Sequence, residues 1–350
     1  MIKASYKKYI LDFKRASGTS RGVLTQKETW FLILEKDSKK GIGECGILRG
    51  LSIDDRPDYE EKLQWVCQNI HLGKQKLYNS LIEFPSIQFG MEMAFLSLES
   101  DNSLELFLSD FTENRRSIPI NGLVWMGEPS YMKEQIEQKI AERFNCIKLK
   151  IGAIDFNKEL ELLQFIRTHF DSKTIEIRVD ANGGFSAEEA LSKLNQLHKF
   201  DLHSIEQPIK QQQIAEMAEL CEKTPFPIAL DEELIGVFSL DDKEQLLVKI
   251  KPQYIILKPS LVGGFQGTQE WISLAEKLNI GWWITSALES NIGLNAIAQF
   301  TFTLNSSLPQ GLGTGGLYTN NFDSPLEVKE GQLWYNTDLT WSINQPNFIF

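Results

Sequence analysis

The chain has 350 residues, too many for one small domain and enough for a barrel of typical size plus about one further domain. With 42% hydrophobic and 24% charged residues it can bury large cores, which excludes a disordered chain. The net charge of -11 argues against nucleic acid as a partner, because no basic stripe is available to neutralise phosphates.

The start of the chain and its cysteines indicate the cellular compartment in which the protein is found. Lys3, Lys7 and Lys8 stand where a signal peptide needs an apolar core, and no apolar stretch approaches membrane-spanning length. The four cysteines show no CxxC spacing, which favours a reduced compartment over a disulfide framework. We therefore predict a cytoplasmic protein with no membrane partner; its oligomeric state stays open.

The first third of the chain differs in pattern from the rest. Residues 2–14 and 28–36 read as antiparallel strands, joined by a polar, glycine-containing loop at 17–22. Helical patterns follow near 57–69 and 87–99, with no strand expected between them. Strands followed by helices indicate a separate α+β domain.

From residue 118 onward, predicted strands and helices alternate without interruption. The helices are expected near 129–143, 156–170, 186–199, 211–223, 240–248, 264–279 and 291–304. Ser186 is predicted to cap its helix, because acids fill the turn that follows it. The last strands are expected at 282–285 and, briefly, near 310–312. Counting from Ile118 gives eight strands, the number that closes a parallel TIM-type (β/α) barrel.

The end of the chain is strand-like at 333–335 and 348–350 but has no barrel position left. We expect it to return to the first domain. The predicted organisation is an α+β capping domain at 1–115, a catalytic barrel at 116–319 and a returning tail at 320–350.

Five charged residues end five consecutive predicted strands: Lys150, Asp180, Glu206, Asp231 and Lys258. Consecutive members are 30, 26, 25 and 27 positions apart, about the length of one strand-plus-helix unit. If the strands are parallel, all five groups meet at the carboxyl edge of one sheet, where α/β folds place their chemistry. Three acids flanked by two lysines suggest a divalent metal between two proton-transfer groups.

Each acid alone could be a solvated loop residue or a helix cap. The prediction of a metal site therefore depends on the recurrence of all three acids at strand ends. Three carboxylates suit Mg²⁺, which prefers oxygen ligands and keeps positions open for water and substrate. Lys148 shares the strand face of Lys150 by the period of two. Two lysines that point into a barrel are costly unless they are paired or used.

A glycine-rich segment follows the last predicted strand. Gly311, Gly313 and Gly316 match a dinucleotide fingerprint by spacing, but no helix start follows in a βαβ unit, so we interpret the match as accidental. Such a segment can still present backbone N–H groups to an anion.

At these spacings the motifs resemble the enolase superfamily, specifically its muconate-lactonising subgroup, over essentially the whole chain. The matching motifs are the residues at 148–150, Asp180-Ala181-Asn182, Glu206-Gln207-Pro208, Asp231-Glu232 and Lys258-Pro259. Within the subgroup, residues 284–294 and 310–314 look like the seventh- and eighth-strand segments of o-succinylbenzoate synthases. Dipeptide epimerases carry an Asp-x-Asp after the eighth strand, and residues 311–323 contain none.

The resemblance implies metal-dependent removal of the α-proton of a small carboxylate substrate. Asp180, Glu206 and Asp231 would bind Mg²⁺, or Mn²⁺ in its place. Lys150 would be the base, with its pKa depressed by Lys148 and the metal. In a synthase of this kind Lys150 would then return the proton to the departing hydroxyl, completing a syn dehydration on the route to menaquinone.

The remaining roles also follow from the resemblance. Lys258 would stabilise the enediolate from the opposite face. The succinyl end of the substrate would be held by Thr285, Ser286, Gly311, Gly313 and Thr314. Capping loops around 17–25 and 47–52 would close over the site. Arg178, Asn182 and Glu232 are candidates to support the metal ligands, although a structural ion pair is about as plausible for Arg178.

Three functions compete. The first is dehydration to o-succinylbenzoate. The second is racemisation of N-acylated amino acids, dipeptide epimerisation or muconate-type cycloisomerisation on the same residues. The third is a barrel that only binds a metal and an anion, against which the five intact catalytic positions weigh.

Overall fold

The structure, a computed structural model, describes residues 1–19, 22–152 and 154–342. The predicted strand-like end at 348–350 lies outside the described residues, as does part of the predicted loop at 17–22. None of the helices in the described ranges combines the length and apolar character that crossing a membrane requires.

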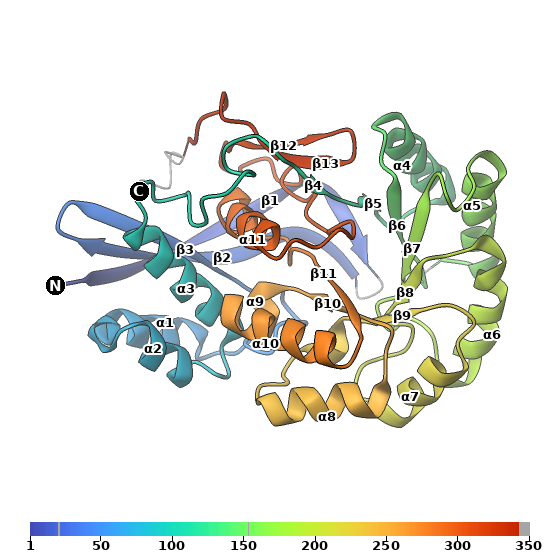
Figure 1. Cartoon of the computed structure of the whole chain (residues 1–350), viewed down its shortest axis with the longest axis horizontal. Helices are drawn as coiled ribbons and strands as arrows, with labels where there is room; N and C mark the ends of the chain where they lie inside the picture. Colours follow the sequence, from blue (N-terminus) through green and yellow to red (C-terminus); the bar gives the residue numbers. More distant parts are fainter. Residues whose placement is uncertain (20–21, 153, 343–350) are drawn as a thin grey trace.

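The N-terminal region is an antiparallel sheet covered by helices (Figure 1). Its strands are β1 (Lys3–Thr19), β2 (Gly22–Lys36) and β3 (Lys39–Gly46), in that order. Its helices are α1 (Tyr59–Gln68), η1 (Ile70–Leu72), α2 (Lys74–Ser80) and α3 (Pro85–Glu99). Strand β3 and helix α2 were not predicted: β3 is rich in glycine and lysine, and β-propensity is low for both.

Glycines allow α3 to lie directly on β3. A Cβ atom on Gly43 would stand 1.8 Å from the carbonyl oxygen of Gly90, and one on Gly90 would stand 2.2 Å from Cys45 Sγ. No side chain fits at either position, so the backbones of strand and helix meet at close range. Helix α3 therefore packs directly against β3 in the first domain.

The second region is a curled parallel sheet with helices around its outside (Figure 1). The strands, in spatial and chain order, are β5 (Gly122–Val124), β6 (Cys146–Lys150), β7 (Glu176–Asp180), β8 (Ser204–Glu206), β9 (Ile228–Leu230), β10 (Tyr254–Leu257) and β11 (Gly281–Ile284). The helices are α4 (Pro129–Ala141), α5 (Phe156–His169), α6 (Ala187–Leu197), η2 (His198–Phe200), α7 (Ile214–Lys223), η3 (Glu232–Leu234), α8 (Leu240–Ile250), α9 (Pro259–Val262), α10 (Gly264–Lys277) and α11 (Asn291–Thr303).

The eighth barrel position is filled by a short segment rather than a full strand. Gln310 forms a parallel bridge to Ile120, and Gly311 forms one to Thr285. These bridges join the end of β11 to the residues that lead into β5. The expected barrel fold is confirmed, with seven regular strands in the described residues.

The predicted cap at Ser186 is also confirmed. Its hydroxyl accepts a hydrogen bond from the Glu189 backbone N–H, and the Glu189 carboxylate accepts one from the Ser186 N–H. This reciprocal pair is a capping box, which fixes the start of α6.

The chain after the barrel has two destinations. Tyr318 bridges to Phe13 of β1, and Asn320 accepts from the Asp12 N–H at 2.8 Å. Further on, β12 (Leu326–Lys329) and β13 (Gln332–Tyr335) form a hairpin that pairs with β4 (Ile118–Pro119) at the entrance to the barrel. The first part of the tail therefore contacts the first domain, and the hairpin contacts the barrel.

Two buried acids of the first domain bind helix starts in the barrel. Glu92 of α3 accepts from the Phe265 N–H at 2.7 Å, at the start of α10. Glu44 of β3 accepts from the backbone N–H groups of Ser290 and Gly293, both at 2.9 Å, at the start of α11. Because helix N-termini attract negative charge, these contacts fix the first domain over the barrel rim.

Candidate active site

Strand pairing brings the predicted charged residues together at the carboxyl edge of the barrel. Lys150 lies opposite Asp180 in the register of β6 and β7, and Asp180 lies opposite Glu206 in that of β7 and β8. Asp231 and Lys258 directly follow β9 and β10. The parallel register alone thus aligns the ends of neighbouring strands, as the spacing predicted.

Lys148 and Lys150 reach the acids from one side. Lys148 Nζ is 2.9 Å from Asp180 Oδ2 and also contacts Glu206. Lys150 Nζ is 2.6 Å from the same Asp180 oxygen and 2.7 Å from Asn182 Oδ1. Both lysines are buried, and each contacts acceptor oxygens. These contacts offset the cost of burying a charged group inside the barrel.

Lys258 approaches the acids from another strand and forms an ion pair with Asp231. Burial alone would lower the pKa of Lys258, but the charges of Asp231 and Glu206 outweigh it and raise that pKa. Lys148 behaves in the same way, with its pKa raised by Asp180 and Glu206 against the effect of burial. Lys258 is therefore held as a cation across the cluster from Lys150.

The three acids divide into two electrostatic types. Burial would raise the pKa of Asp180 and of Asp231, yet the lysines beside them lower both. Glu206 lies between them, and its pKa is raised well above the usual value by burial and then by the charge of Asp180. Three buried carboxylates this close together need cationic partners.

The donor set fits a hard divalent cation. Asp180, Glu206 and Asp231 supply only carboxylate oxygens, and buried Glu206 Oε1 has no hydrogen-bond partner within the described residues. In the same part of the chain, no group of three His, Cys, Asp or Glu side chains is spaced as a formed metal cage. Ammonium groups of Lys148 and Lys258 contact the carboxylates instead.

A cavity of about 90 Å³ opens beside this cluster. Its lining includes Lys148, Lys150 and Lys258 together with all five residues predicted to hold the substrate, Thr285, Ser286, Gly311, Gly313 and Thr314. Thr285 Oγ1 donates to the Gly311 carbonyl at 2.9 Å, and the hydroxyls of Ser286 and Thr314 are 2.6 Å apart. These bonds join the end of β11 to the eighth segment.

Sequence reasoning missed the opposite wall of the cavity. Leu24, Leu48 and Leu51 of the first domain line it, as do Leu123 and Trp125 at the start of the barrel. None of them belongs to a motif that indicates chemistry. The available signal was the expectation that loops near 17–25 and 47–52 lie over the site. Leu48 and Leu51 fall within the second of these ranges, and Leu24 falls within the first but lies in β2.

The three supporting candidates are placed differently. Asn182 accepts from Lys150 and donates to Glu232 at 3.0 Å, so both belong to the polar cluster. Arg178 instead donates to Glu176 at 2.7 Å and lies 4.2 Å over the Trp283 ring. The structure therefore brings Arg178 to a structural ion pair with Glu176 and not to the metal-ligand candidates.

Comparison with known proteins gives consistent matches. Residues 131–339 match the family model "Enolase C-terminal domain-like", and residues 2–98 match "MenC, N-terminal domain". The o-succinylbenzoate synthase of Desulfotalea psychrophila is 48% identical over 95% of this chain and 98% of its own length. The crystal structure of MenC from the same organism superposes with a TM-score of 0.85, covering 95% of this chain and 99% of that one at 44% identity.

More distant relatives share the fold. The L-amino acid-D/L-Glu epimerase of Francisella philomiragia is 27% identical over 70% of this chain and 65% of its own. The muconate lactonizing enzyme of Pseudomonas fluorescens superposes with a TM-score of 0.83 at 22% identity, over 97% of this chain and 96% of that one.

Proposed function

Because this chain belongs to the enolase superfamily and, within it, to the family of the o-succinylbenzoate synthases, we propose that it dehydrates 2-succinyl-6-hydroxy-2,4-cyclohexadiene-1-carboxylate to 2-succinylbenzoate. The enzyme is thus a carbon–oxygen lyase. We place the reaction in menaquinone synthesis in the cytoplasm, with Mg²⁺ as the metal and Mn²⁺ as its substitute. The observation that supports the proposal best is the placement of Lys150 and Lys258 around one acid cluster beside one cavity.

Asp180, Glu206 and Asp231 would hold the metal, which would withdraw electron density from the substrate carboxylate and make the α-proton more acidic. Lys150 takes that proton from carbon. The electron pair left behind becomes the enediolate. Lys258 stays protonated and lies beside the developing negative charge, which it stabilises in a site with little water.

The second half of the reaction uses the same lysine. Protonated Lys150 gives its proton to the ring hydroxyl as the C–O bond breaks, and water leaves. The enediolate electrons form the new C=C bond, so the ring becomes aromatic and no redox partner is needed. Because one group serves both steps, the proton and the hydroxyl leave from the same face.

Thr285, Ser286 and the backbone of Gly311, Gly313 and Thr314 would hold the succinyl end. These are neutral donors and acceptors, and residues 311–323 carry no Asp-x-Asp that would repel a carboxylate and grip an amino group. This charge pattern favours the synthase over a dipeptide epimerase.

A racemase of N-succinyl amino acids is the second candidate, since lysines on two sides of the acids also suit a two-base reaction. The test is to measure kcat/KM for dehydration and for racemisation on one preparation. We expect dehydration to be faster by at least about a hundredfold. Equal rates, or racemisation alone, would assign the chain to the second candidate.

The metal is tested separately with Glu206→Gln. We expect calorimetric titration of Mg²⁺ to show affinity lowered by about tenfold or more, with turnover lost in excess chelator and restored by added metal. Glu216→Gln, on the exposed side of α7, is the matched control. Full activity in chelator would remove the metal from the reaction.

A further inference from the structure

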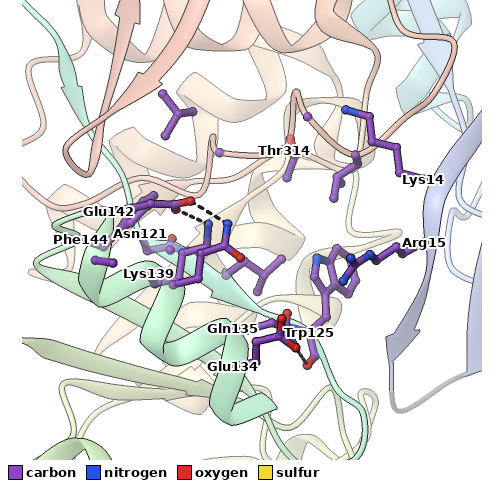
Figure 2. A pocket seen from close by; sticks show the side chains of 18 of the residues that line it. Lys14, Arg15, Asn121, Trp125, Glu134, Gln135, Lys139, Glu142, Phe144 and Thr314 are labelled. Carbon is purple, nitrogen blue, oxygen red and sulfur yellow. Dashed lines mark hydrogen bonds and ion pairs between the residues drawn. The ribbon is translucent and has the colours of Figure 1, made fainter. Parts of the chain in front are cut away.

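The turn at residues 286–288 leaves the barrel sheet after β11 and lines the catalytic cavity. Its first residue is still held by the barrel, because the Ser286 N–H donates to the Gly311 carbonyl at 3.1 Å. The Ser286 hydroxyl is bonded to that of Thr314, which also lines a larger cavity of about 840 Å³ (Figure 2). Thr314 therefore belongs to the wall between the two cavities, and the turn is bonded to that wall.

Beyond Ser286 the turn adopts a backbone conformation that is uncommon for residues other than glycine. The φ angle of Leu288 is +61°, in the left-handed region, where a bulky side chain strains the backbone. Such a conformation persists only where the surrounding structure holds it. Two side chains do so here. The Tyr318 hydroxyl donates to the Leu288 carbonyl at 2.6 Å, and Glu289 Oε2 accepts from the Ala287 N–H at 2.8 Å.

Glu289 also binds the segment that follows Lys258. Its other oxygen, Oε1, accepts from the Ser260 hydroxyl at 2.6 Å, and Ser260 lies in α9, which begins directly after Lys258. Glu289 is fully buried and is not among the residues that line either cavity. One carboxylate therefore joins the turn that lines the catalytic cavity to the turn that follows a catalytic lysine, without contacting the substrate itself.

The first domain supplies a positive charge to this buried acid. Burial raises the pKa of Glu289, whereas Lys27 of β2 and then the Ser260 hydroxyl lower it. Lys27 is 3% exposed, and its ammonium group forms no hydrogen bond within the described residues, so it acts on Glu289 through its charge. The Glu44 carboxylate has the opposite effect on the Glu289 pKa. Lys27 thus favours the ionised carboxylate, which accepts both hydrogen bonds.

We propose that Glu289 is a positioning residue that holds the turn at 286–288 in the shape that receives the substrate chain. The inference rests on the proposed function, because that chain is the succinyl group. With Glu289 in place the strained backbone at Leu288 is ordered before the substrate binds, so binding does not have to supply that ordering. The bond to Ser260 fixes the same turn relative to Lys258, and the two ends of the substrate are then bound at a set separation.

The test compares Glu289→Ala with Glu289→Gln. Alanine removes both hydrogen bonds, whereas glutamine can keep them, because its carbonyl accepts from the Ala287 N–H and its amide donates to the Ser260 hydroxyl oxygen. We expect the KM for dehydration to rise roughly tenfold in Glu289→Ala, with kcat within about threefold of the wild type. Glu289→Gln should keep KM within about threefold of the wild type, which a role of geometry rather than of charge requires.

Glu92→Ala is the matched control. Glu92 is also a buried acid that accepts backbone N–H groups between the two domains, and it lines neither cavity. Both alanine variants should lose stability in chemical denaturation, but Glu92→Ala should keep KM within about twofold. An equal rise of KM in Glu92→Ala, an unchanged KM in Glu289→Ala, or a KM as high in Glu289→Gln as in Glu289→Ala would overturn the inference.

Binding of the reaction product, 2-succinylbenzoate, gives a second measurement that needs no turnover. Titration calorimetry with Mg²⁺ present should show its affinity lowered roughly tenfold in Glu289→Ala and retained in Glu289→Gln and Glu92→Ala. Ser260→Ala, which removes one of the two bonds, should raise KM about threefold and replaces Glu289→Ala if that variant does not fold. A wild type that binds 2-succinylbenzoate but does not dehydrate the substrate would overturn the proposed function, and the binding comparison would still decide the role of Glu289.

Discussion

The two walls of the catalytic cavity differ in how they are built. The barrel wall places its groups by parallel register, so that Lys150, Asp180 and Glu206 are neighbours because their strands pair in chain order. The capping wall brings Leu24 of β2 together with Leu48 and Leu51 of the segment after β3, and none of these residues belongs to the barrel sheet. The acids and the lysines therefore lie where the backbone repeats, and the leucines that close the cavity lie where it does not.

Among the variants that test this difference between the two walls, Lys150→Ala should have the largest effect on activity. Loss of the group that moves the proton should lower kcat by about a thousandfold and abolish exchange of the substrate α-proton with solvent. Exchange is followed by nuclear magnetic resonance in deuterated water. The control Lys249→Ala removes an exposed lysine on α8 and should change neither quantity. Continued exchange in Lys150→Ala would assign the base to another residue.

Next in size is a test of whether the capping domain folds as one body. Gly43→Ala places a methyl group where the Gly90 carbonyl lies, and the backbones of β3 and α3 must separate. We expect a loss of about 3 kcal/mol in the free energy of unfolding, at the upper end for overpacking. Chemical denaturation measures it. Gly316→Ala is the control, because its Cβ would meet nothing within 4 Å.

Should Gly43→Ala be as stable as Gly316→Ala, the close contact of α3 and β3 would not define the domain. A stable variant with a raised KM would also be informative, since it would tie the position of α3 to the capping wall.

The contact between the two regions should depend on pH through Glu92. Burial raises the pKa of this carboxyl from 4.5 to about 7, despite the Phe265 and Gln266 N–H groups that lower it. Between pH 4.5 and 7 the folded protein binds more protons at Glu92 than the unfolded chain does. Its contribution to stability is therefore present at low pH and falls as pH rises through this window, by about 2 kcal/mol between pH 5 and 7.

Glu92→Gln isolates this effect. The amide oxygen can still accept from α10 but cannot ionise, so the fall in stability between pH 5 and 7 should become smaller by about that amount. Thermal unfolding at several pH values in parallel with the wild type measures it. An unchanged pH profile would show that another group controls the contact.

Sequence alone predicted much of the barrel and little of the capping wall. The positions of Lys148, Lys150, Asp180 and Glu206 can be predicted from strand register and the two-residue period of a strand, without knowledge of side-chain packing. Arg178 obeys the same period, but its side chain forms an ion pair with the neighbouring Glu176. Strand β3 was missed because its glycines are needed for close packing against α3. This helix lies far along the chain from β3, so no local sequence pattern indicates the contact. The bulge in β1 between Asp12 and Ser17 was missed for the same reason, since its partner is Leu317.

The smallest expected effect concerns Trp125, which lines the catalytic cavity at the start of the barrel and belongs to no motif. Gln135 holds its backbone through two hydrogen bonds of 2.9 Å, so substitution of the side chain should leave the strand in place. Trp125→Ala should lower kcat/KM about tenfold through KM, because apolar contact with the substrate is lost while Lys150 and Lys258 are untouched. Trp282→Ala, half-buried on β11 and lining neither cavity, is the matched control. Steady-state kinetics on both variants decides the matter. A fall in kcat with KM unchanged would mean that Trp125 contributes to chemistry as well as to fit, and the division between proton-transfer groups and substrate-fitting groups would no longer hold.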